Sequence, residues 1–69
     1  MEKEKYIVWV SSKNYKKCSH NQFHTEAKSI QEAIDNCNSH ANFEFKIMGV
    51  GGYKKVNVSE ENFVNNKFY

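Results

Sequence analysis

The sequence predicts an α+β domain in which an antiparallel four-stranded sheet packs one of its faces on a single helix, in the order ββαββ. Two segments with the two-residue alternation of strands precede an amphipathic helical segment, and two more follow it. The chain has no proline, and its three glycines all lie within residues 49–52, so we expect no linker. Its 69 residues are enough for one small hydrophobic core and one domain.

The first two strands are expected at residues 6–12 and 22–27. Residues 6–12 carry β-branched and aromatic side chains on both alternating faces, which is typical of a strand in the middle of a sheet. The polar residues 13–21 predict a loop, and residues 22–27 then alternate as a strand that returns beside the first. We therefore expect an antiparallel hairpin with a long loop.

The sequence predicts a helix that starts at Ser29. Ser29 and Glu32 fit a capping box, in which the serine side chain accepts from an amide of the first turn and the glutamate reaches back. The apolar residues that follow have helical spacing and form one inward stripe: Ile30, Ala33, Ile34 and Cys37. The residues expected to face water are Gln31, Glu32, Asp35, Asn36 and Asn38. The helix is expected to end near Ser39 or His40, where this periodicity stops.

Two further strands are expected at residues 42–48 and 53–58, because both segments alternate with period two. Gly51 and Gly52 lie between them and can supply the positive φ angles of a tight turn. Residues 59–66 begin with Ser-Glu-Glu, which suits a helix start, so a short C-terminal helix is expected there.

One helix can cover only one face of four strands, so the other face of the sheet is expected to be open. The ordered core should span about residues 6–58. The side chains expected between helix and sheet are Val8, Val10, Phe23, Ile30, Ile34, Cys37, Phe43, Phe45, Ile47, Val56 and Val58. Those expected on the open face are Ile7, Trp9, His24, Glu26, Lys46, Met48, Tyr53 and Lys55.

The open face is the candidate binding surface, because tryptophan, tyrosine and methionine are favoured in protein interfaces. With the lysines of the first loop added, the predicted partner-binding residues are Trp9, Lys16, Lys17, Lys46, Tyr53 and Lys55. Three alternatives stay open: burial of this face by residues 59–69, a homodimer, and nucleic-acid binding. In the last of these, bases would stack on Trp9 or Tyr53 while lysines neutralise phosphates.

Composition and motifs argue against several classes of function. The formal net charge is only +2, with ten basic and eight acidic side chains mixed along the chain, which is not the signature of a dedicated DNA-binding protein. The residues that could in principle bind a metal are Cys18, His20, His24, Cys37 and His40. Their spacing is not that of a standard zinc finger, and no base with an orienting group accompanies a nucleophile. We therefore expect no metal, no cofactor and no enzymatic activity.

The cysteine count and the apolar runs bear on the compartment. Two cysteines are too few for a secreted disulfide framework, so both are expected to stay thiols. No apolar run is long enough for a signal peptide or a membrane span. The expectation is a cytoplasmic protein that does not bind membranes.

The element order over residues 6–58, with the helix start EAKSIQEAI at residues 26–34, resembles small phage-encoded accessory proteins, among them anti-CRISPR proteins of ββαββ order. The resemblance implies a stoichiometric inhibitor that binds a host factor, such as a CRISPR or other defence complex, in the host cytoplasm. The modest positive charge departs from the strongly acidic DNA mimics among such inhibitors. We therefore expect a non-enzymatic protein-interaction module, with a small nucleic-acid-binding or regulatory protein as the alternative.

Overall fold

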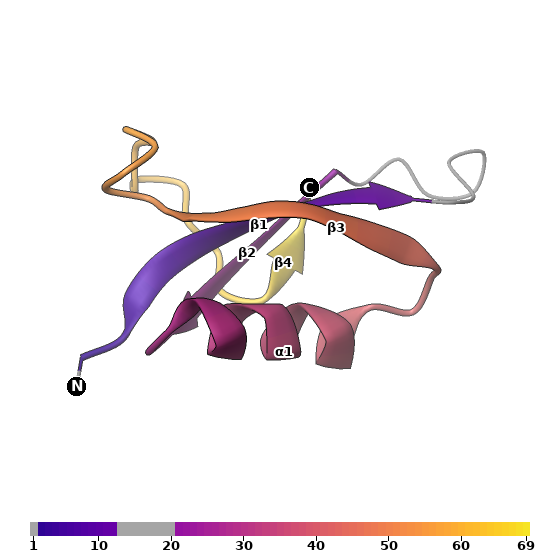
Figure 1. Ribbon diagram of the computed structural model, residues 1–69. Helices are drawn as coiled ribbons and strands as arrows, with labels where there is room; N and C mark the ends of the chain where they lie inside the picture. The colour runs from indigo at the N-terminus through magenta and orange to yellow at the C-terminus, as the bar shows by residue number, and fades with distance from the viewer. Residues whose placement is uncertain (1, 13–20) are drawn as a thin grey trace.

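The sheet is antiparallel throughout and has the strand order β3-β1-β2-β4, with helix α1 across one of its faces (Figure 1). This computed structural model describes residues 2–12 and 21–69. The elements are β1 (Glu4–Ser12), β2 (Gln22–Ala27), α1 (Ile30–His40), β3 (Phe45–Gly52) and β4 (Lys67–Phe68). The α+β class, the single helix and the four-stranded antiparallel sheet are confirmed, whereas the positions of the last elements differ from the prediction.

The main core lies between α1 and the sheet. It consists of the buried side chains of Val8, Val10, Phe23, Ala27, Ala33 and Cys37. Partly buried apolar residues that pack around it are Tyr6, Phe45, Ile47, Val50 and Phe68. β1 lies in the middle of the sheet between β3 and β2, as its two apolar faces predict.

The start of α1 is confirmed in detail. The Ser29 hydroxyl accepts a hydrogen bond from the backbone N–H of Glu32 at 3.2 Å, and the Glu32 carboxylate accepts from the backbone N–H of Lys28 at 3.3 Å. Ala33 and Cys37 are fully buried, as predicted. Ile30 does not join them: its side chain is 51% exposed, because the first turn of α1 borders a surface depression instead of the packed core.

Asn36, which we expected to face water, is half-buried against β2. Its side-chain amide donates to the Thr25 hydroxyl at 3.0 Å and to the Glu26 carbonyl at 3.3 Å. A buried polar side chain is tolerated when its hydrogen bonds are made, and here they fasten α1 to β2.

The predicted turn at Gly51 and Gly52 is wrong, because β3 continues through both residues, with Gly51 paired to Ile7 and Gly52 paired to Tyr6. No glycine among the described residues has a positive φ. The Trp9 ring explains the need for glycine, because a β-carbon at Gly51 would lie 3.1 Å from it. Gly51 therefore serves the close approach of a side chain and not the reversal of the chain.

The predicted fourth strand at residues 53–58 and the predicted helix at residues 59–66 are also wrong. The N–H groups of Lys55 and Val56 both donate to the Gly52 carbonyl at 3.1 Å, so this segment forms turns. Residues 59–66 continue in turns and irregular backbone, and the fourth strand is the two-residue β4.

We name residues 53–69 the C-terminal strap. The strap follows β3, rises on the side of the sheet opposite α1 and returns to pair with β2 (Figure 1). It covers the face that we expected to be open: Ile7 and Tyr53 are 2% exposed and His24 is 8% exposed. Of the alternatives that the sequence leaves open for this face, the described residues therefore show burial by the chain's own C-terminal segment.

Val56 and Val58 belong to the strap and not to the core beneath α1, where they were expected. Val56 approaches Gly51, on the face opposite the helix, and Val58 is partly exposed. They leave that core because the segment that carries them turns away from the sheet instead of pairing with it.

Candidate protein-interaction site

The structure separates the residues predicted to bind a partner. Tyr53 is buried, so its expected place on an open surface is wrong; the strap folds this side chain onto β2. Trp9 is half-buried against Gly49 and Gly51. Tyr53 therefore packs between the strap and the sheet, and Trp9 packs against the glycines of β3.

The predicted lysines have a different environment. Lys46 lies on β3 and Lys55 in the turn after it, and both side chains are exposed. Lys16 and Lys17 lie outside the described residues. The predicted loop at residues 13–21, which carries them, falls outside the described part except for its last residue. Of the lysines predicted to bind a partner, the two that the structure describes thus lie near the start of β3 and just after its end.

A buried hydrogen-bond chain joins the strap to β2. The Tyr53 hydroxyl contacts Nδ1 of His24, and Nε2 of His24 lies 2.8 Å from Oε1 of Gln22. Because an amide oxygen only accepts, Nε2 carries the proton. Burial lowers the pKa of His24 and so disfavours a second proton, which leaves Nδ1 to accept from the Tyr53 hydroxyl. The rings of Phe63 and Tyr69 pack on the same imidazole, at centroid distances of 6.4 Å and 4.3 Å.

Burial shifts the pKa values of both His24 and Tyr53. Desolvation lowers the pKa of His24 below its ordinary value of 6.5. Burial, with smaller contributions from Tyr69 and Glu60, raises the pKa of Tyr53 to about 12. The pair is closed to solvent and fastens the strap to β2. The sequence placed both residues on one face and gave no signal for their contact.

The outer edge of β2 is closed by side chains and by β4. Phe68 of β4 pairs with Phe23 of β2, and this pairing occupies the first part of the β2 edge. Beyond β4, the Asn65 side chain accepts from the backbone N–H of Glu26 at 2.8 Å, and the Asn36 side chain donates to the carbonyl of Glu26. Side chains thus take over the hydrogen bonds where β4 is too short to make them.

In the described part of the chain, the outer edge of β3 has no such cover before Gly52, where the turn that follows closes the edge. β3 pairs with β1 on one side, and no described strand pairs with its other side. An edge strand of an antiparallel sheet turns the N–H and C=O groups of alternate residues outward. Lys46 and Met48 expose their side chains along it, and Met48, at 63%, lies where the register of β3 against β1 shifts. β3 therefore offers an edge to another chain over the residues before Gly52, whose outward carbonyl is already bonded to the N–H groups of Lys55 and Val56.

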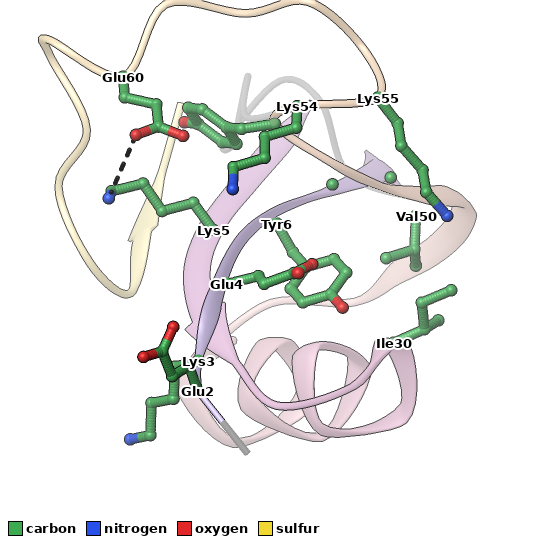
Figure 2. A pocket seen from close by; sticks show the side chains of 13 residues that line it. Glu2, Lys3, Glu4, Lys5, Tyr6, Ile30, Val50, Lys54, Lys55 and Glu60 are labelled. Atoms are coloured by element: carbon green, nitrogen blue, oxygen red, sulfur yellow. Dashed lines mark ion pairs between the residues drawn. The ribbon is translucent and has the colours of Figure 1, made fainter.

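A depression of about 450 Å³ adjoins the end of β3 (Figure 2). Its apolar lining comes from Tyr6, Ile30 and Val50, which lie between the sheet and the first turn of α1 in Figure 2. Its charged lining consists of Glu2, Lys3, Glu4, Lys5, Lys54, Lys55 and Glu60. The depression was not predicted, because helical spacing placed Ile30 in the core and alternation predicted a strand at residues 53–58.

The charges of the depression are unevenly paired. Lys5 forms an ion pair with Glu60 at 3.5 Å, shown by the dashed line in Figure 2. Lys54 and Lys55 are exposed and form no ion pair with any described residue. The side chain of Lys55 extends toward Val50 in the same view. The β3 side of the depression therefore offers two free positive charges beside an apolar surface.

The remaining candidate groups show no reactive arrangement in residues 2–12 and 21–69. No three histidine, cysteine or acidic side chains there are placed to hold a metal ion, and Cys18 and His20 lie outside this part. Cys37 is a buried thiol, and burial raises its pKa to about 11, which keeps it in the unreactive neutral form. The helix α1 is too short and too polar to span a membrane, and the described residues contain no other helix.

No protein-family model, curated protein or solved structure matches the chain. The function is therefore inferred from the geometry of the two sheet edges and the depression.

Proposed function

We propose that the chain is a non-enzymatic protein-interaction module that binds an extended segment of a partner protein along the outer edge of β3. The observation that carries this proposal is the contrast between the two edges. The edge of β2 is closed by β4, Asn65 and Asn36, whereas no described strand pairs with the outer edge of β3, which is closed only at Gly52 by the turn that follows. An unpaired edge is the template on which partner strands add to a sheet.

The side chains along β3 favour a foreign partner over a second copy. Lysines and register irregularities on edge strands oppose pairing between identical sheets, because like charges meet and the edge bends. Lys46 and the register shift at Met48 are such features. They leave the backbone groups accessible to a segment of complementary charge.

The class of partner is proposed from the resemblance to small phage-encoded inhibitors. A domain this small can act as a stoichiometric inhibitor by occupying a surface of a host protein, for example in a CRISPR or other defence complex. The near-balanced charge supports binding to a protein surface over mimicry of DNA.

The nucleic-acid alternative has no specific observation in its favour. It needs exposed aromatic rings on which bases stack, but Tyr53 is buried and Trp9 is half-buried. A gel shift at low salt tests this alternative, and we expect no retention of single-stranded or duplex nucleic acid.

The test of the proposed function is capture of a host partner by the whole chain, followed by binding measurements with charge-reversed variants. The double variant Lys46→Glu with Lys55→Glu should weaken binding, because both lysines flank the β3 edge. The single variant Lys28→Glu reverses an exposed charge between β2 and α1 and serves as the control. Equal binding by the double variant, the control and the unmodified chain would show that the assigned edge is wrong.

A further inference from the structure

We infer that the segment added to β3 is acidic and carries one bulky apolar side chain, which enters the depression between β3 and the first turn of α1. This inference rests on the proposed function, because it names the chemistry of the partner at the same site. The inference rests on two observations near the end of β3. One is the set of side chains paired across β2, β1 and β3, which form rows over the sheet, and the other is the set of charged residues beside these rows.

One of these rows is incomplete. Tyr6 pairs with Thr25 on β2 and with Gly52 on β3, and directly paired residues present their side chains on the same face. Gly52 carries no side chain, so the row ends at an unfilled position beside the Tyr6 ring. A β-carbon at Gly52 would meet Tyr6 and the Lys5 carbonyl only at 3.9 Å, an ordinary van der Waals distance. Part of the depression is thus the space that a missing side chain leaves.

The neighbouring row ends in apolar surface. Phe23, Val8 and Val50 are paired across β2, β1 and β3 and point toward α1. A strand added beside β3 would send alternate side chains toward this same face. One of them would lie against Val50 and against Ile30, which is half-exposed on the other wall of the depression (Figure 2). An apolar side chain there removes the exposed surface of Ile30 from water.

The charges beside β3 set the sign of the partner. Residues 44–55 contain three lysines, Lys46, Lys54 and Lys55, and one acidic residue, Glu44. The rest of the lining is balanced in charge, because Lys5 is paired with Glu60 and Lys3 lies among Glu2 and Glu4. The unpaired positive charge therefore lies on the β3 side. Carboxylates on the added segment would meet the unpaired lysines, whereas a second copy of the chain would bring its own Lys46, Lys54 and Lys55 against them.

Selection of peptides from a random displayed library on the whole immobilised chain tests the inference. We expect the enriched peptides to contain acidic residues and one large aliphatic or aromatic residue. The double variant Lys54→Glu with Lys55→Glu should lower the affinity for such a peptide about tenfold, because two attractions between exposed charges become repulsions. Ile30→Ser should weaken it as well, at little cost to folding because the side chain is half-exposed. Lys28→Glu is the charge-matched control outside the depression and should leave binding unchanged.

The outcomes separate the two proposals. Peptides that protect β3 amides but show no acidic preference, or that bind the lysine variant equally well, would overturn this inference and leave the proposed function standing. No enrichment, or protection of other elements only, would contradict the proposed function itself. If the lysine variant does not fold, the affinity of the unmodified chain for the peptide is measured at increasing salt concentrations instead. The affinity for an acidic peptide must fall as the salt concentration rises, because salt screens its attraction to the lysines. A dimer of the free chain paired through β3 would also overturn the inference.

Discussion

The Tyr53 hydroxyl donates a hydrogen bond to Nδ1 of His24 and thereby joins the first residue of the C-terminal strap to β2 across 29 positions of sequence. Both side chains are almost fully buried, and His24 Nε2 is bonded in turn to Gln22. The contact holds the strap on the face opposite α1 and so decides which surfaces are left for binding.

Removal of that hydroxyl is expected to destabilise the fold. Tyr53→Phe keeps the ring but leaves Nδ1 of His24 buried without a donor, which costs about 1–3 kcal/mol in the free energy of unfolding. Urea unfolding measures this cost. Tyr69→Phe is the matched control, because its hydroxyl makes an exposed 3.3 Å hydrogen bond to the Asn62 carbonyl, and it should cost clearly less. Equal losses in the two variants would contradict the assigned hydrogen bond.

The same contact predicts a pH dependence of stability. Burial lowers the pKa of His24 in the folded state below 6.5, so the folded chain favours the neutral imidazole. This contribution is fully present above pH 6.5 and is lost as the pH falls from 6.5 through the folded-state pKa. Free energies of unfolding measured across this range should decrease toward acid. In His24→Gln, which cannot titrate at this position, the decrease should be smaller; an identical pH profile would refute the assignment.

Gly51 should resist replacement more than Gly49. A β-carbon at Gly51 would lie 3.0 Å from Val56 and 3.1 Å from the Trp9 ring, whereas one at Gly49 would lie 3.7 Å from Trp9. Gly51→Ala is expected to cost about 1–3 kcal/mol of unfolding free energy through overpacking, and Gly49→Ala much less. Chemical denaturation compares the two. A larger loss for Gly49→Ala would mean that Val56 and the Trp9 ring do not crowd Gly51 as described.

Cys37 should be protected from alkylation in the native chain. The thiol is fully buried and its pKa is raised to about 11, so little thiolate is accessible at neutral pH. In the Cys18→Ser variant, which leaves Cys37 as the only thiol, the iodoacetamide reaction should be slow and should accelerate in denaturing urea. Reaction at the same rate with and without urea would place Cys37 outside the core.

The parts of the fold that were predictable depend on short-range signals. The cap at Ser29 and the burial of Ala33 and Cys37 follow from helical spacing within a few residues, and both are confirmed. The strap depends on contacts between distant residues, such as Tyr53 with His24, which no local alternation encodes. The period-two alternation at residues 53–58 therefore predicted a strand, but this segment forms turns in the folded chain.

The candidate site was predictable only in part, for the same reason. Lys46 and Lys55 are exposed as expected, but Tyr53 was assigned to the surface because the sequence does not reveal the covering strap. The open edge of β3 and the depression depend on strand order, which the sequence could not supply. Their recognition required the structure.

Amide hydrogen exchange along β3, measured residue by residue in the free chain and with a bound partner or selected peptide, tests the central claim most directly. In the free chain, N–H groups of Phe45–Gly52 that point away from β1 should exchange faster than those bonded to β1. On binding, the outward-pointing amides should become protected. Outward amides that are already protected in the free chain, or that gain no protection in the complex, would contradict binding at the β3 edge.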